Sequence, residues 1–593
     1  MSTTQASPGS AASAPGELAP MFTHKQILSI LAGLMMGMFL AALDQTIVST
    51  SIRTIADDLH GFSVQAWVTT AYLITSTIAT PLYGKLSDLY GRKPYFMAAI
   101  SIFVVGSMLC GLATSMYQLA AFRAFQGLGA GGLMSMALTI LGDIVPPRER
   151  SKYQGYFLAV FGTSSVLGPV LGGLLAGQSS ILGVTGWRWV FYINVPLGIM
   201  ALVVVWRVLN LPVHHRDAKV DWWGAVLLAV ALVPLLIVAE QGRTWGWSSG
   251  TALLCFAVGL AGIAAFIAAE LRMGDDALIP MRFFRNSIFS VGVVVSVVAG
   301  AAMFGGISLL PLYLQVAKGS SPTLAGYQIL PMVLGMMSAS ILSGQLIART
   351  GRYKVYPIIG TGLITVGMVL FSFVHADTPL WQSMLIMLMF GLGLGNMMQP
   401  LTLAIQNAMP PKDMGVSTAA ATFFRQIGAT LGVAVFLSLL FSELTPKIAD
   451  SLRTAAGQPQ FQQALKTAAT GSDPVQAGFA QGILKQDPSV AGSALTDTAF
   501  IQKLDPILAA PFKMGFSNAM DVVFVCVAAV MFVGFIMVWF FKEIPLRGQS
   551  GLAAQQADRD AAAASQQAAL SAADAPFVED VAAGGEHTGP PES

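Results

Sequence analysis

The sequence contains, at residues 84–93, the stretch GKLSDLYGRK, and it contains a second, related stretch, GQLIARTGRYK, at residues 344–354. In each copy two glycines lie the same distance apart, since 91 − 84 = 7 and 351 − 344 = 7. Long apolar segments flank both copies, so each is expected to form a short loop between two membrane spans. The repeat therefore divides the chain into two halves of similar build.

The composition is that of a membrane protein. Of the 593 residues, 54% are hydrophobic and only 10% are charged, whereas roughly a quarter of the residues in soluble domains are charged. The formal net charge is +2, so no basic excess indicates a nucleic-acid partner. A bilayer core takes about 20 apolar residues per helix, and by this measure the chain has fourteen spans. We expect an all-α membrane protein whose main partner is the lipid bilayer.

The distance between the two copies predicts the domain organisation. It is 344 − 84 = 260 residues, or about eight spans, which leaves six spans in each of two bundles and two extra helices between them. Copies that run in the same direction indicate bundles related by an axis along the membrane normal, with a cavity between them. The expected divisions are a disordered cytoplasmic N-terminus (1–24), a first bundle (25–210), two linker helices (221–271), a second bundle (286–541) that includes a long extracytoplasmic loop (443–514), and a disordered cytoplasmic tail (548–593).

The distribution of Lys and Arg predicts the orientation in the membrane. Most of them lie in loops on the side of both termini, while the opposite short loops contain only Arg53, Arg188, Arg243 and Lys318. Both termini are therefore expected in the cytoplasm, with the protein in the cell (inner or plasma) membrane. In the outside loop, amphipathic patterns predict short helices around Phe461–Thr470 and Ala491–Leu508.

Further motifs follow one another along the spans. They are LDQTIV at 43–48, RAFQGLG at 123–129, GPVLGG at 168–173, WRWVFYINVP at 187–196, LPLYLQ at 310–315 and FRQIG at 424–428. Together with the repeated loop they resemble the major facilitator superfamily, and within it the 14-span drug:proton antiporter branch, over residues 25–442 and 515–541. The resemblance implies a transporter that exports small molecules in exchange for protons by alternating access.

The motif at 84–93 is interpreted as a latch between the two bundles. Gly84 and Gly91 allow a tight turn, and Asp88 can cap a helix end and pair with an arginine across the bundle interface in one conformation only. A plain positively charged loop is the alternative, which would explain Arg92 and Lys93 but not the repeated glycine spacing. The second copy has Ala348 where the first has Asp88, so no latch carboxylate is expected there.

A second motif, in the fifth span, consists of Gly162, Gly168, Pro169, Gly172 and Gly173. Small residues let helices approach closely, and a proline inside a span frees a carbonyl and kinks the helix. In the family that the sequence resembles, this pattern accompanies antiporters, which favours export over import. The alternative is a glycine-rich packing face without functional meaning.

Three ionisable residues are placed inside spans, where a charge is costly and therefore indicates function: Asp44, Arg123 and Arg425. Asp44 lies about 28 Å along its helix from the cytoplasmic start, towards the outer mouth. We expect all three to take part in proton coupling, with Arg425 reaching Asp44 when the outer mouth closes. The alternatives are a helix-end carboxylate in interfacial water for Asp44, and for Arg123 a structural hydrogen-bond hub with Gln126.

Polar and methionine side chains on the expected cavity spans predict a substrate site. They are Gln45, Gln126, Tyr313, Gln315, Met336, Gln399 and Gln406. Methionines adapt to irregular apolar ligands, although methionine is also common at lipid-facing positions.

The sequence contains no catalytic constellation, phosphate-binding loop or metal-ligand spacing. We therefore expect neither an enzyme nor a cofactor or bound metal, and an ion gradient as the energy source. Three functions remain open: proton-coupled export of amphiphilic or cationic drugs, export of one specific metabolite such as an amino acid, a siderophore or a lipid, and a non-transporting membrane sensor on the same fold. A monomer is expected.

Overall fold

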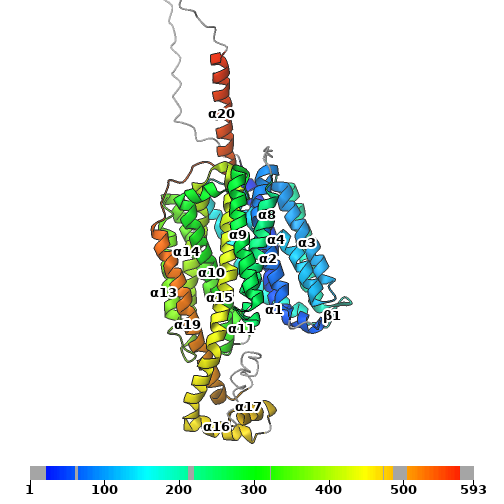
Figure 1. The fold of residues 1–593 in the computed structure, drawn as a ribbon, viewed down its shortest axis with the longest axis vertical. Coiled ribbons are helices and arrows are strands. Elements are labelled where there is room, and N and C mark those ends of the chain that lie inside the picture. The colour runs from blue at the N-terminus through cyan, green and yellow to red at the C-terminus, as the bar shows by residue number, and fades with distance from the viewer. Residues whose placement is uncertain are drawn as a thin grey trace, which may run out of the picture.

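The computed structural model describes residues 22–60, 64–211, 220–320, 322–471, 473–484 and 504–573. Helices account for nearly all of this part, and its strands are one short antiparallel pair, β1 (Ser180–Ile181) and β2 (Val184–Thr185). We call one end of the molecule the latch end, where α20 (Gly551–Ala573) begins, and the opposite one the cap end, where α16 (Pro459–Ala469) and α17 (Pro474–Leu484) lie (Figure 1).

The first bundle contains α1 (His24–Asp58), α2 (Ala66–Tyr90), α3 (Arg92–Gly111), α4 (Met116–Ile144), α5 (Pro147–Ala176), and the consecutive pieces η2 (Gly186–Arg188), α6 (Trp189–Tyr192) and α7 (Asn194–Val208). Helix α1 begins at a capping box, in which Thr23 and Gln26 satisfy each other's backbone N–H groups. Helix α4 packs against α2 and α3, and α1 packs against α5 and α7. Buried apolar residues of α1, α3 and α4 fill the space between these helices.

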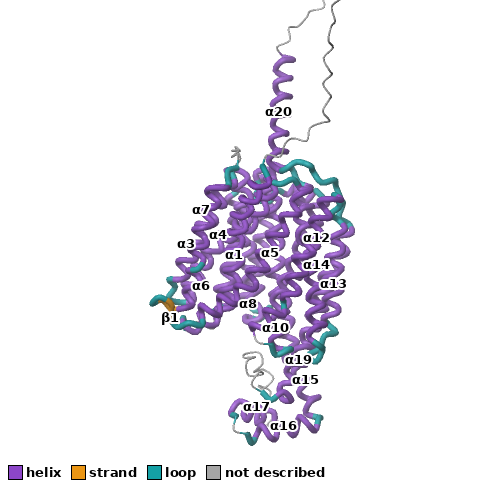
Figure 2. Tube along the Cα trace, turned by 180° about the vertical axis from the view of Figure 1, so that it is seen from behind, coloured by secondary structure: helices purple, strands orange, loops and turns teal. Residues whose placement is uncertain are grey.

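The second bundle repeats this arrangement. It contains α10 (Ser287–Val316), α11 (Pro322–Gln328), α12 (Leu330–Thr350), α13 (Val355–Phe371), α14 (Leu380–Ala408), α15 (Met414–Ala456) and α19 (Pro506–Trp539). Helix α14 packs against α12 and α13, as α4 packs against α2 and α3, and α15 packs against α10 and α19. The bundles meet where α2 contacts α15 and where α5 contacts α12. Figure 2 shows the two groups of helices from behind.

Helices α8 (Trp222–Trp245) and α9 (Gly250–Met273) lie between the bundles in the sequence and pack against each other. Helix α8 also contacts α2 and α15, so the pair lies beside the junction of the bundles rather than within either one. Leucines on α9, among them Leu253, Leu254, Leu260 and Leu271, are exposed. An apolar helix face without protein cover is typical of contact with lipid.

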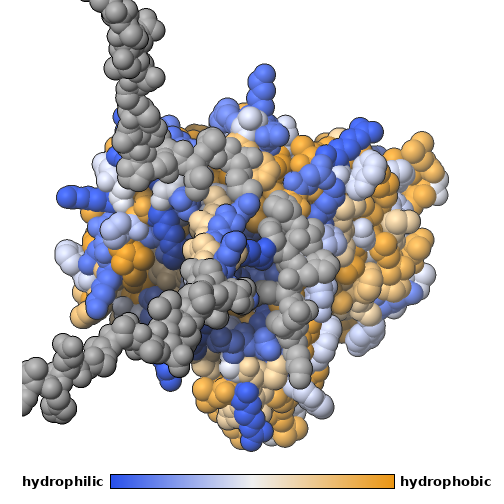
Figure 3. Space-filling view, turned by 90° about the horizontal axis from the view of Figure 1, so that it is seen from above, coloured by the Kyte–Doolittle hydropathy of each residue, from blue (hydrophilic) through white to orange (hydrophobic). Residues whose placement is uncertain are grey.

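Twelve of the described helical segments are long and apolar enough to cross a membrane. Helix α13 is shorter, with 17 residues, and α2 contains Pro81. Hydrophilic residues gather on the latch end, as expected for a surface outside the bilayer (Figure 3). The protein is therefore a multi-pass helical membrane protein.

Two of the expected divisions need correction. The loop expected at 443–514 begins inside α15, which continues as one helix to Ala456, and α19 already begins at Pro506. Disorder of the tail at 548–593 is wrong for Gly551–Ala573, which forms α20, because its alanines and glutamines favour helix and its first turns have packing partners.

Of the two short helices expected in the outside loop, the structure describes one. Helix α16 confirms the amphipathic helix expected around Phe461–Thr470. Most of the one expected at Ala491–Leu508 lies outside the described residues, as do most of the N-terminal segment 1–24 and the end of the tail, 574–593.

Candidate functional site

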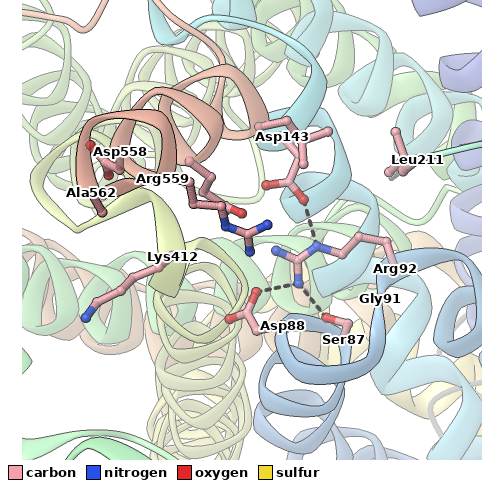
Figure 4. Close-up of a pocket in the computed structure, with 12 residues that line it drawn as sticks. Ser87, Asp88, Gly91, Arg92, Asp143, Leu211, Lys412, Asp558, Arg559 and Ala562 are labelled. Atoms are coloured by element: carbon pink, nitrogen blue, oxygen red, sulfur yellow. Dashed lines mark hydrogen bonds and ion pairs between the residues drawn. The ribbon is translucent and has the colours of Figure 1, made fainter. Parts of the chain in front are cut away.

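The latch motif forms a buried cluster of charges at the latch end (Figure 4). Arg92 stands at the start of α3, with Nη1 2.5 Å from Asp88 Oδ1 and Nε 2.7 Å from Asp143 Oδ2 at the end of α4. Its Nη1 also donates to Ser87 Oγ at 2.7 Å. The Asp88 and Asp143 side chains are only 5% and 2% exposed, so one buried arginine is shared by two buried carboxylates.

Asp88 also joins the first bundle to the second. Its carboxylate accepts hydrogen bonds from the backbone N–H groups of Gly415 (3.1 Å) and Val416 (2.8 Å), in the first turn of α15. Unpaired N–H groups and the helix dipole make such a terminus favourable for a negative charge. The expected helix cap is therefore present and crosses the interface, whereas the arginine partner, expected across the interface, belongs to the same bundle as Asp88.

Glycine at position 84 permits this contact. A Cβ atom built on Gly84 would lie 2.4 Å from Ala419 Cβ and 2.9 Å from the Gly415 carbonyl oxygen, so α2 and α15 could not approach so closely with a larger residue. Gly91 has φ of 98°, in the left-handed region that favours glycine. Lys93 has a different role from the one expected, because its Nζ donates to the Trp206 carbonyl at 2.6 Å and to Asn210 within the first bundle.

Other contacts across the interface lie nearby. Arg150 is fully buried and donates to Gln406 of α14 at 2.5 Å and to the Gly142 carbonyl at 2.6 Å. Arg148 donates to the carbonyls of Ala348 (2.9 Å) and Arg349 (3.2 Å), at the end of α12. The bonds to Gln406 and to the end of α12 cross the interface and hold the two bundles together at the latch end.

Asp44 lies at the centre of a second polar cluster, inside the first bundle. It is fully buried and accepts hydrogen bonds from Arg123 (2.5 Å), Gln126 (3.0 Å) and Asn194 (2.8 Å). Ser107 Oγ accepts from both amide groups, at 3.2 Å from Gln126 and 2.9 Å from Asn194. Four helices, α1, α3, α4 and α7, therefore supply the cluster.

The Arg123 side chain is held in place by more than its carboxylate partner. Its guanidinium lies over the Tyr72 ring of α2, 4.0 Å from the centroid, and Nη1 donates to Gln126 Oε1 at 2.7 Å. A buried charge is stable only when it is paired and hydrogen-bonded, and this cluster meets both conditions. Asp44 and Arg123 form a neutral pair sealed from water.

The pairing of Asp44 with Arg425, which the sequence predicts for the state with a closed outer mouth, is not present in this structure, which is closed at the latch end. Asp44 pairs with Arg123, which stands on a neighbouring helix of the same bundle, whereas Arg425 belongs to α15 of the other bundle. Among the described residues, no carboxylate oxygen lies within ion-pair distance of Arg425. The structure thus supports the hub of Arg123 with Gln126 that the sequence left open, and it adds Asp44 to that hub.

The glycine motif of α5 packs on both neighbours of that helix. Cβ atoms on Gly168 and Gly172 would meet Thr46 and the Ile47 carbonyl of α1, and one on Gly162 would meet Val333 of α12. Gly173 has open space around it, and Pro169 lies inside the helix. The motif therefore allows α5 to lie close to α1 within its bundle and to α12 across the interface.

The residues expected to bind substrate do not lie together. Gln126 is part of the Asp44 cluster, and Gln406 is fully buried, where it accepts from Arg150 and donates to Thr418. Tyr313 is fully buried among aromatic rings of the second bundle. Met336 and Gln399 are 8% and 9% exposed, and Gln45 and Gln315 are half-buried.

Sequence reasoning missed several residues of these clusters. Ser107 and Tyr72 give no signal, because a serine or tyrosine within an apolar span is common. Arg148, Arg150 and Asp143 lie at the boundaries of spans. In the sequence alone, a charged residue at the boundary of a span that faces water cannot be distinguished from one that binds a helix terminus.

Two helical bundles of parallel build, joined by a buried charge cluster, define a membrane transporter. The profile of the Major Facilitator Superfamily matches residues 34–433, and the chain belongs to this family. It is 33% identical over 544 residues to the multidrug transporter protein MdtP of Bacillus subtilis, covering 90% of this chain and 96% of that one. It is 35% identical over 429 residues to multidrug resistance protein 3 of the same organism, covering 72% and 82%.

A solved structure shows the same fold. The proton:xylose symporter XylE matches with a TM-score of 0.56 and 15% identity, over 90% of this chain and all of that one. The family and fold are those of transporters rather than of enzymes, and a lipid bilayer and a small-molecule substrate are the partners that they imply.

Proposed function

We propose that the protein exports amphiphilic or cationic small molecules in exchange for protons, as a monomer, by alternating access across the cell membrane. The names of relatives that match most of the chain, a multidrug transporter and a multidrug resistance protein, support the substrate class. The single observation that carries the coupling mechanism is the buried pair of Asp44 and Arg123 in the first bundle.

The topology of this proposal has fourteen spans, with α2 and α13 added to the twelve apolar helices. The latch end lies in the cytoplasm, because Arg92, Arg148 and Arg150 gather there and positive charge is retained on that side. The cap end, with α16 and α17, then lies outside. This arrangement supports a state that is closed towards the cytoplasm.

Proton coupling follows from the chemistry of Asp44. A proton that reaches its carboxylate removes the charge that Arg123, Gln126 and Asn194 now stabilise. The buried arginine is then left without its counter-charge, which is costly, so the helices that supply the cluster must rearrange. Loss of the proton restores the neutral pair. Proton binding and helix movement are in this way one event, as an antiporter requires.

The decisive experiment compares Asp44→Asn with the control Asp57→Asn, which alters an exposed carboxylate of the same helix. Purified protein is reconstituted in liposomes with its cap end outside. The outer solution is made more acidic than the lumen, and the efflux of ethidium from the liposomes is followed. Asparagine keeps the shape of Asp44 but cannot titrate. We expect Asp44→Asn to abolish gradient-driven transport while ethidium exchange without a gradient persists, and Asp57→Asn to resemble the wild type. Gradient-driven transport at the normal rate in Asp44→Asn would refute the assignment.

A further inference from the structure

Helix α20 begins directly on the latch. A Cβ atom built on Gly551 would lie 3.1 Å from both Asp143 Oδ1 and the Gly142 carbonyl oxygen, at the end of α4. Leu552 is buried, and Gln555 Nε2 donates to the Pro411 carbonyl at 2.7 Å, just before α15. The first turns of α20 therefore contact both bundles at once, although the helix follows the last span of the second one.

The segment before α20 is fixed along the second bundle. Glu543 accepts from the backbone N–H groups of Tyr353 (2.6 Å) and Lys354 (3.1 Å), and the Tyr353 hydroxyl accepts from the Ile544 N–H at 3.0 Å. Burial raises the pKa of Tyr353, so this phenol stays protonated. Asn407 then donates to the Pro545 carbonyl and accepts from the Arg547 N–H, both at 3.1 Å. Together these bonds direct the chain to the junction of the bundles.

Asp143 provides the independent sign that α20 has a role there. Its Oδ2 binds Arg92, but its Oδ1 is buried and has no hydrogen-bond partner among the described residues. This oxygen lies against Gly551, at the N-terminus of a 23-residue helix. The positive end of a helix stabilises a nearby carboxylate through its dipole even without a direct hydrogen bond, whereas the first turn of α15 also donates two N–H groups to Asp88.

The two carboxylates of the latch thus have related surroundings, although within the described part of the chain only Asp88 accepts backbone hydrogen bonds from its helix N-terminus. Each binds Arg92 on one side and faces a helix N-terminus on the other, α15 for Asp88 and α20 for Asp143. Between α20 and the latch remains a cavity of about 270 Å³, and Arg559 of α20 extends into it towards the latch (Figure 4).

We infer that α20 is a working part of the latch: it docks on Asp143 in the state that is closed at the latch end, stabilises that state, and must leave before the bundles can separate there. This inference rests on the proposed function in one respect: it assumes a state that is open at the latch end, which alternating access requires. In this role, α20 controls how often the latch end opens.

The test uses a matched pair of glycines. Gly551→Leu pushes the start of α20 away from Asp143, whereas Gly548→Leu, three residues earlier, places its side chain where nothing lies within 4 Å. The reporter is Met414→Cys, a buried position against Gly142 that we expect to become accessible when the bundles part, in a chain whose Cys110, Cys255 and Cys526 are replaced by serine. Full-length protein in nanodiscs is labelled with a maleimide, without substrate or gradient.

We expect Gly551→Leu to raise the labelling rate about two- to fivefold, the range for losing one charge–helix interaction, and Gly548→Leu to leave it unchanged. Removal of residues 551–593 should raise it at least as much. Unchanged labelling in both Gly551→Leu and the truncation would overturn the inference. Because no transport is measured, this outcome is independent of Asp44→Asn, which tests the proposed function.

Discussion

The two copies of the repeated loop share a glycine that ends a helix, but they differ in backbone conformation, with ψ of 154° at Gly91 and −5° at Gly351, and in chemistry. Each ends its helix on a glycine with positive φ, 98° at Gly91 and 73° at Gly351. Each stands at a contact between the bundles, the first copy where α2 meets α15 and the second where α12 meets α5. The repeat therefore places a helix-ending glycine at a contact between the bundles on both sides of the molecule.

The polar contacts in the two places have opposite charges: a negative side chain binds a helix N-terminus in the first copy, and a positive side chain binds a helix C-terminus in the second. In the first copy the buried carboxylate of Asp88 accepts from the N-terminus of α15. In the second copy, where Ala348 replaces the aspartate, carbonyls at the C-terminus of α12 accept from the exposed side chain of Arg148. Because a buried charge contact is screened less than an exposed one, the first copy contributes more than the second to the free energy that closes the latch end.

The largest effect is expected from Gly84→Leu. Any Cβ at this position would overlap Ala419 and the Gly415 carbonyl, so the first interface could not close. Export of ethidium in liposomes should be abolished. Gly173→Leu is the control, since its side chain meets nothing within 4 Å, and it should keep most activity. Normal transport by Gly84→Leu would show that the close approach of α2 and α15 is not needed.

The next effect is expected from Asp88→Asn, which removes the charge but keeps the shape. A partly buried charge at a helix terminus contributes up to about 2 kcal/mol, so the equilibrium between closed and open latch should shift by up to about 30-fold. Labelling of Met414→Cys should rise accordingly. A rise as small as twofold would mean that the two copies contribute equally.

The sequence alone predicted the framework of this comparison. The glycine spacing identified both loops, the missing carboxylate in the second copy was visible as Ala348, and a helix cap by Asp88 was expected, although not which helix end it would cap. These features are local, because a glycine turn or an acid at a helix end is decided within a few residues.

The partners of buried charges could not be predicted in this way. The pairing of Asp44 with Arg123 was not expected from the sequence, because the distance between two spans depends on how their helices pack. The tail was expected to be disordered, because its composition lacks large apolar residues, and the contact of Gly551 with Asp143 depends on one glycine and a distant helix end. Long-range packing determines both outcomes.

A third prediction concerns Ala348→Asp, which introduces into the second copy the acid that it lacks. Ala348→Asp places a carboxylate beside Arg148 and the start of α5, as Asp88 stands beside the start of α15. A partly exposed ion pair contributes about 0.2–1 kcal/mol, so labelling of Met414→Cys should slow by up to about fivefold. In the Asp88→Asn background the same change should restore part of the closed state. If the labelling rate did not fall in that background, a carboxylate at position 348 would not stabilise the closed state.

The smallest effect is expected from Arg148→Ala. The two carbonyls that this side chain binds stand at an exposed helix terminus, where water can replace the arginine. An exposed contact of this kind contributes at most about 1 kcal/mol, and we expect the labelling rate of Met414→Cys to change by about twofold. Arg148→Lys, which keeps the charge near the C-terminus of α12, should be closer still to the wild type. If Arg148→Ala opened the latch end as much as Asp88→Asn does, the closing free energy would be shared by both copies, and the asymmetry drawn from Ala348 would be wrong.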